Sequence, residues 1–172
     1  GFPAGSHDWG KYMIRKLLLT CAASVMALAG IASAQGTPVS GTILTSTWDI
    51  NGSPYNIMGP VTVDSAHTLT IDAGVEVVFQ ADVRFNVEGA LEVYGSESEM
   101  VVFRPMPAME WGGIYLNAGV EANLGMSSYI EWAEITGAVS DTIGGAIHVS
   151  GMDTHLDISH SIIHHNSTPS YG

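Results

Sequence analysis

Acidic side chains that recur at a fixed spacing are the first candidates for chemistry. Asp72 and Glu88 are separated by a sequence offset of 16, and Glu76 and Glu92 by the same offset. If this offset is one turn of a repeat, each pair lies on neighbouring strands about 4.7–4.9 Å apart. Such carboxylates would suit a calcium ion, which prefers clustered oxygen ligands, or glycoside hydrolysis, which needs two carboxyl groups roughly 5–9 Å apart. The simpler interpretation, which we favour, is that the side chains splay apart into water.

Two arginines are the only basic side chains of residues 35–172, apart from histidine. Arg84 alternates with acidic and polar residues along a predicted strand, and Arg104 precedes a proline at a strand end. Both placements favour ion pairs with nearby carboxylates over a catalytic role.

Five histidines gather toward the C-terminus: His148, His155, His160, His164 and His165. A transition-metal site needs three or four convergent ligands, each held by a further partner. If adjacent His164 and His165 lie in a strand they point to opposite faces, whereas a turn leaves their directions undetermined, so we expect the histidines to be polar surface residues. The sequence therefore assigns no catalytic, cofactor-binding or metal-binding residue, and calcium is the only cofactor that we consider.

Trp111 and Asn166 each have a binding and a structural interpretation. The Trp111 ring could serve as a platform for a sugar, but its place before two glycines favours packing in the core or at a corner. Asn166 can bond backbone groups within a turn. The glycosylation sequons that begin at Asn51 and Asn166 matter only in a host that glycosylates its proteins.

These residues lie among short predicted strands joined by glycine turns. Apolar and polar residues alternate over 68–71, 75–79, 84–87 and 90–95, and turns at 72–74 and 88–89 separate them. A period of two indicates half-buried strands. One face of these strands is apolar: Leu69, Ile71, Val75, Val77, Phe79, Phe85, Val87, Leu91 and Val93.

The spacing of similar segments indicates a repeat. Besides the 16-residue spacing, residues 130–135 align with residues 158–163 at an offset of 28. Short strands, glycine corners and a recurring period predict a solenoid, in which each turn buries its apolar stripe against the next. The alternative is a β-sandwich, which would have longer strands, of about five or six residues, and no recurring register.

Charge and cysteine content restrict the partners. Residues 35–172 contain 16 acidic residues, two arginines and no cysteine, which gives a formal charge of −14. Nucleic acid is excluded as a partner because its binding depends on cationic side chains. The segment also has no disulfide to stabilise it, so its stability must come from a packed core or from stacked repeats.

The N-terminal residues have the order of a bacterial secretory signal. A basic start at Met13–Lys16 precedes an apolar run over Leu17–Ile31 and the small residues Ala32-Ser33-Ala34. We predict cleavage between Ala34 and Gln35. The apolar run is shorter than the roughly 20 residues that a membrane span needs, so no transmembrane span is expected after cleavage.

Several segments then follow in a familiar order. These are residues 61–79, Val87-Glu88-Gly89-Ala90-Leu91, residues 101–114, Gly144-Gly145-Ala146-Ile147 and Ile163-His164-His165-Asn166. The first three resemble successive coils of secreted bacterial right-handed parallel β-helix proteins of the pectin-lyase-like group. The last two resemble the GGAI and Ile-x-x-Asn repeats of polymorphic outer-membrane proteins. The resemblance covers about residues 40–172 and implies an all-β, right-handed parallel β-helix. The segment Val120–Gly125 interrupts the pattern.

The resulting order of segments is as follows. We predict translated upstream sequence or a cloning remnant over 1–12, a signal peptide over 13–34, a linker over 35–47, an N-terminal strand and cap segment over 48–66, and β-helix coils over 67–172. No cap is visible after the last coil, so the natural protein is expected to be longer and truncated here at its C-terminus.

The resemblance implies two functions from different classes. The first, which we favour, is a secreted or cell-surface β-helix with a structural and binding role, whose extended face contacts glycans or cell-surface proteins and which has no catalytic centre in this fragment. The alternative is an extracellular polysaccharide lyase or glycoside hydrolase with its catalytic coils beyond residue 172. A lyase of this group would use an arginine or lysine base beside calcium, and only Arg84 and Arg104 are available.

Overall fold

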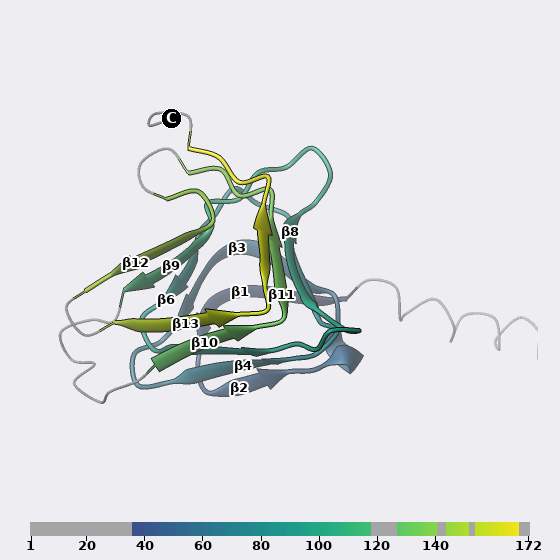
Figure 1. The fold of residues 1–172 in the computed structure, drawn as a ribbon. Coiled ribbons are helices and arrows are strands. Elements are labelled where there is room, and N and C mark those ends of the chain that lie inside the picture. The colour runs from purple at the N-terminus through teal and green to yellow at the C-terminus, as the bar shows by residue number, and fades with distance from the viewer. Residues whose placement is uncertain (1–35, 118–126, 141–143, 152–153, 169–172) are drawn as a thin grey trace, which may run out of the picture. The chain divides into compact units, whose positions relative to one another are not determined.

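The computed structural model describes residues 36–117, 127–140, 144–151 and 154–168 (Figure 1). The chain divides into two units, Gly1–Gln35 and Gly36–Gly172, and every described residue belongs to the second. The predicted signal peptide and the expected interruption at Val120–Gly125 lie outside the described residues.

The described residues form an all-β fold with one short 3-10 helix. The elements are β1 (Thr37–Ile43), β2 (Ser46–Trp48), η1 (Ile50–Gly52), β3 (Tyr55–Val63), β4 (Thr68–Asp72), β5 (Glu76–Phe79), β6 (Phe85–Val87), β7 (Ala90–Tyr94), β8 (Val101–Pro105), β9 (Ile114–Asn117), β10 (Ser127–Glu131), β11 (Ala133–Thr136), β12 (Ile147–Ser150), β13 (His155–Ser159) and β14 (Ile162–His164). The four strands predicted between residues 68 and 95 are confirmed as β4 to β7. Strand β1 lies within the segment that the sequence predicts to be a linker.

Every strand pairing in the two sheets is parallel. One sheet has the order β13-β10-β7-β4-β2. The other has the order β12-β9-β6-β3-β5-β8-β11-β14, with β1 paired to β3. Strand β3 joins two arms of this second sheet, because its first half pairs with β5 and its second half with β6. Figure 1 shows the five-stranded sheet and the two arms along three sides of a common interior.

The chain visits these three sides in a fixed order. From β4 onward, every third strand returns to the same side: β4, β7, β10 and β13 lie in the five-stranded sheet, β5, β8, β11 and β14 in one arm, and β6, β9 and β12 in the other. The predicted 28-residue offset is confirmed, since Ile130 pairs with Ile158 and Ile135 with Ile163.

The predicted 16-residue offset is wrong. Leu69 pairs with Leu91, and Thr70 with Glu92, at a longer offset of 22. The shorter offset instead connects β4 to β6, which lies on a different side of the interior. The error has a physical origin. Each strand has the same alternation and ends in a similar turn, so similarity in sequence does not tell which strands stack.

The interior is filled by columns of apolar side chains from successive strands. Ile71, Val93 and Ile130 form one such column and are each at most 1% exposed. All nine residues of the predicted apolar face are buried. Burial of each large apolar side chain contributes about 1.5–3 kcal/mol to folding, so stacking of the strands provides the main stabilisation.

The two ends of this stack differ. At the N-terminal end, formed by β1, β2 and β3, Trp48 stacks on Tyr55 with ring centroids 4.5 Å apart, and both are buried. At the C-terminal end, formed by β12, β13 and β14, the columns stop at Ile158 and Ile163, which are 44% and 45% exposed.

Candidate binding face

The outer surface of the five-stranded sheet carries the most distinctive group of side chains. Alternate residues of a strand point to opposite faces of a sheet. In β4, β7 and β10 the apolar set points inward and is buried, so the residues between them point outward. The sheet therefore positions outward side chains from each of these strands side by side.

Register brings tyrosines and glutamates together on this face. Tyr129 of β10 lies opposite Glu92 of β7, and Glu131 of β10 lies opposite Tyr94 of β7. Each tyrosine thus has a glutamate directly across from it and another at the next outward position of its own strand. We call these four residues the tyrosine–glutamate square. Its two rings are 43% (Tyr94) and 39% (Tyr129) exposed.

Both neighbouring strands extend the square with polar residues. On one side, β13 places Asp157 opposite Tyr129 and Ser159 opposite Glu131. On the other, β4 places Thr70 opposite Glu92 and Asp72 opposite Tyr94. The Thr70 hydroxyl donates to the Glu92 carboxylate at 3.4 Å. The result is four carboxylates around two tyrosine rings.

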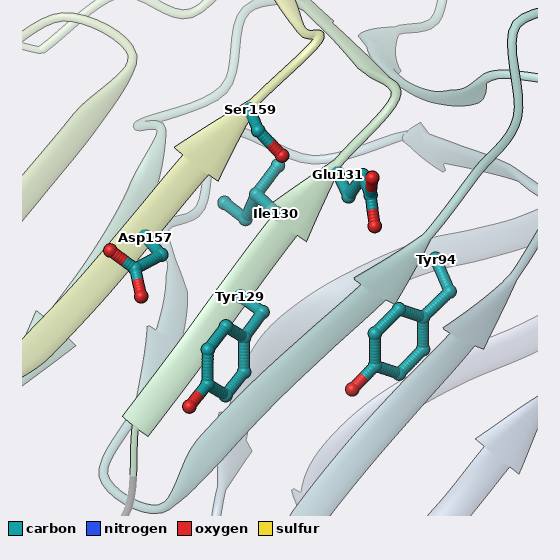
Figure 2. A pocket seen from close by; sticks show the side chains of 6 residues that line it. All are labelled: Tyr94, Tyr129, Ile130, Glu131, Asp157 and Ser159. Atoms are coloured by element: carbon teal, nitrogen blue, oxygen red, sulfur yellow. The ribbon is translucent and has the colours of Figure 1, made fainter.

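A shallow recess of about 130 Å³ lies within this arrangement. It is lined by Tyr94, Tyr129, Ile130, Glu131, Asp157 and Ser159. Figure 2 shows the two rings on neighbouring strands, with their faces turned outward and their hydroxyl groups pointing the same way. The recess therefore offers flat aromatic surface beside carboxylate oxygens, all carried by paired strands.

The electrostatic character of the face is negative. None of its five strands contains lysine or arginine. Partial burial raises the pKa of the Tyr94 hydroxyl above its ordinary value of 10.0, and the charge of Glu92 raises it further. Tyr94 is therefore protonated at neutral pH and can donate a hydrogen bond from the face.

A face of this kind offers a cation two contacts, one with a carboxylate and one with an aromatic ring. The chain's own arginines, Arg104 and Arg84, make these contacts elsewhere on the surface. Arg104 donates to the Glu76 carboxylate at 2.7 Å, which confirms the ion pair expected for Arg104. The guanidinium carbon of Arg84 lies 5.8 Å from the centroid of the Tyr115 ring. Arg84 thus contacts an aromatic ring, within the range of a cation–π interaction.

The acidic pairs predicted from the 16-residue spacing are not formed. Asp72 lies opposite Tyr94, and Glu88 follows β6 on a different side of the interior. Glu76 lies in β5 opposite Val102, whereas Glu92 lies in the five-stranded sheet. The spacing argument for calcium or for paired catalytic carboxylates at these residues is therefore wrong, because the true register differs.

The histidines are spread over several contacts. His148 stacks on Tyr115 at 4.8 Å and His160 stacks on Trp132 at 4.6 Å, measured between ring centroids. His164 lies with its Nε2 atom 2.9 Å from a Glu134 carboxylate oxygen.

The condition for opposite orientations of His164 and His165, that both residues lie in a strand, is not met. His165 lies beyond the end of β14 with a φ angle of 53°, and the His164 and His165 rings contact each other through their Nδ1 atoms. His155 is an exposed residue of β13. Among the residues that the structure describes, no three histidine, cysteine, aspartate or glutamate side chains form a group that could hold a metal ion.

Trp111 and Asn166 have the structural roles that we favoured. Trp111 is fully buried and stacks on Phe79 with ring centroids 4.0 Å apart, so it belongs to the core and offers no sugar platform. The Asn166 side chain accepts from the Ala138 N–H at 2.8 Å and donates to the Ile135 and His164 carbonyls at 2.9 Å. It therefore links the turn after β14 to β11 and to the turn that follows β11.

Sequence reasoning missed Tyr94 and Tyr129 as site residues. The alternation Glu92-Val93-Tyr94 and Tyr129-Ile130-Glu131 does show that each tyrosine shares an outward face with a glutamate. That signal identifies the face of each strand. It does not place the two segments opposite each other, because the offset between β7 and β10 does not recur among the other pairings of this sheet.

Comparisons with protein-family models, curated proteins and solved structures found no match. In the part of the chain that the structure describes, no helix is long and apolar enough to cross a membrane. The fold and the outer face of the five-stranded sheet are therefore the observations that bear on function.

Proposed function

We propose that the chain is a secreted or cell-surface protein whose described residues form a right-handed parallel β-helix. The three-strand repeat supports this assignment, because every third strand returns to the same side in parallel register. Parallel strands joined by crossover connections are right-handed in about 98% of cases, which favours the right-handed form. Each coil would bury its apolar stripe against the next.

Export is supported by the N-terminal sequence. The predicted cleavage point after Ala34 lies next to the boundary between the two units, at Gln35 and Gly36. The absence of cysteine from residues 35–172 is compatible with folding outside the cell, because no thiol needs to be kept reduced.

The function that we propose is structural and binding: the protein presents the outer face of the five-stranded sheet to glycans or proteins. One observation carries this proposal. Two tyrosines and four carboxylates share a single face, on which strands β4, β7 and β10 are each paired on both sides. Side chains on such strands are held in place by the backbone, so the face can recognise a ligand without first becoming ordered.

A binding screen tests this function. The full chain is applied to arrays of neutral oligosaccharides and of short peptides, together with a Y94A/Y129A variant and a Y115A control. Tyr115 is a tyrosine of β9, in the other sheet, so it matches the substitution without touching the face. We expect array ligands that bind the native protein and Y115A and lose signal with Y94A/Y129A. Ligands that bind all three proteins equally would place the binding surface elsewhere and contradict the proposal.

A further inference from the structure

The tyrosine–glutamate square has the chemistry to select one kind of ligand. We propose that it binds the guanidinium group of an arginine presented by an extended segment of a partner protein, an inference that rests on the binding function proposed above. The guanidinium would stack on the face of Tyr94 or Tyr129 and pair with the carboxylate of Glu131 or Asp157.

Charge complementarity is the first argument. The face contains four carboxylates, from Asp72, Glu92, Glu131 and Asp157; its strands have no basic residue other than His155, and His160, which follows β13, lies with its Nδ1 atom 3.7 Å from a Glu131 carboxylate oxygen. Residues 35–172 as a whole have a formal charge of −14. A cationic ligand is attracted to such a surface at long range, whereas an anionic sugar or a nucleic acid is repelled.

The flat tyrosine rings are the second argument, and they favour arginine over lysine. A guanidinium is planar, stacks on aromatic faces and matches a carboxylate with two parallel hydrogen bonds. Both rings turn their faces outward beside a carboxylate (Figure 2). A lysine ammonium would find the negative charge but would not use the planar surface as fully.

The third argument is that this chain already makes both contacts with its own arginines. Arg84 lies over the Tyr115 ring, with 5.8 Å between the guanidinium carbon and the ring centroid, and Arg104 donates to Glu76 at 2.7 Å. These arginines lie outside the five-stranded sheet. The square combines an exposed ring and a carboxylate at one place, so an incoming arginine could make both contacts at once.

Register explains how more than one arginine would be accommodated. Tyr129 has Glu92 on one side and Asp157 on the other, and Tyr94 has Asp72 and Glu131 on its two sides. Each tyrosine is therefore flanked by two carboxylates on neighbouring strands. Two arginines at alternate positions of one extended segment point to the same side, so one segment presents two guanidinium groups to this face.

The test compares peptides that differ only in charge. A fluorescent peptide with alternating arginine and glycine is titrated with the full chain, and a second peptide carries citrulline in place of each arginine. Citrulline is planar and uncharged. We expect binding of the arginine peptide, at least fivefold weaker binding of the citrulline peptide, and weaker binding at higher salt because exposed charges are screened.

Variants locate the binding on the square. Y94A and Y129A should each weaken binding of the arginine peptide about two- to fivefold, as expected for an exposed cation–π contact. Y94F and Y129F should bind like the native protein because they keep the ring. E131Q/D157N should weaken binding and reduce its salt dependence, and the Y115A control should have no effect. Circular dichroism of each variant establishes that it is folded.

Several outcomes would overturn the inference. If citrulline and arginine peptides bind equally, or if Y115A weakens binding as much as Y94A, the square does not select a guanidinium. If neutral oligosaccharides bind and depend on Tyr94 and Tyr129 while the arginine peptide does not bind, the arginine inference fails but the proposed binding function stands. If neither ligand binds the native protein, both fail.

Discussion

The two ends of the stacked strands are built from the same alternation of residues and yet reach different states. At the N-terminal end, Trp48 and Tyr55 stack face to face, lie against the interior and are 6% and 7% exposed. At the C-terminal end, Ile158 and Ile163 occupy the inward positions of β13 and β14 and remain almost half exposed. Their equivalents one repeat earlier, Ile130 and Ile135, are buried.

This difference shows that burial in a stacked fold depends on the neighbouring layer as much as on the residue. An inward isoleucine is covered only when another strand lies over it. The N-terminal end solves this problem with two large aromatic rings and with β1, which pairs along β3. Among the described residues, the C-terminal end has no such cover, and the Asn166 side chain only links the turn after β14 to the layer before it.

The largest expected effect comes from removing one ring of the Trp48–Tyr55 pair. Trp48→Ala should lower the free energy of unfolding by about 3–5 kcal/mol, because it deletes a buried ring and leaves a cavity. The matched substitution at the other end, Ile163→Ala, should cost only about 1 kcal/mol, since that side chain is already half in water. Urea denaturation followed by circular dichroism measures both values. Similar losses for the two variants would show that the ends are equally covered.

An intermediate effect is expected from the polar bonds of the C-terminal end. Asn166→Ala removes one accepted and two donated hydrogen bonds and leaves the Ala138 N–H without its partner, so it should cost about 1–3 kcal/mol. The same urea titration measures this loss.

Asn86→Ala is the control for Asn166→Ala. The Asn86 side chain donates to the Val61 carbonyl at the longer distance of 3.3 Å, so its loss should be smaller. A loss at Asn166 no larger than at Asn86 would mean that the last turn is held by packing and not by this side chain.

The sequence predicted the inward face of the strands well, because alternation with a period of two is a local property. Leu69, Phe85 and Leu91 are all buried as expected. It did not predict the stacking of β4 on β7, because neighbouring strands on different sides resemble each other as closely as strands that pair. For the same reason the sequence did not predict the candidate binding face on the five-stranded sheet. Tyr94 and Tyr129 were visible as outward residues, but only the register of β7 with β10 brings them together.

The smallest expected effect depends on pH and concerns the N-terminal end. Burial raises the pKa of Tyr55 above its ordinary value of 10.0. The folded state therefore holds the phenolic proton more tightly than the unfolded state does. The stability that this provides is fully present below about pH 10 and is lost as the pH rises through the folded pKa.

Tyr55→Phe tests this pH dependence. The variant cannot ionise at this position, so as the pH rises above about 10 the native protein should lose the stability that the raised pKa provides, whereas Tyr55→Phe should not. Chemical denaturation at several alkaline pH values measures the difference. Tyr115→Phe is the control, and an equal change in that variant would argue against a particular role of the N-terminal end.

The shared strand β3 has a consequence for how the chain folds. Its pairings join segments that are close in sequence: Thr37 with Tyr55, Tyr55 with Val77 and Val61 with Phe85. The later pairings of β6 with β9 and of β7 with β10 close longer loops. Closing a shorter loop costs less entropy, and β4 closes equally short loops with β2 and β7, so the first layers, joined through β3 and β4, are the favoured nucleus. A chain that emerges N-terminus first would then assemble layer by layer, each new turn using the previous one as its template.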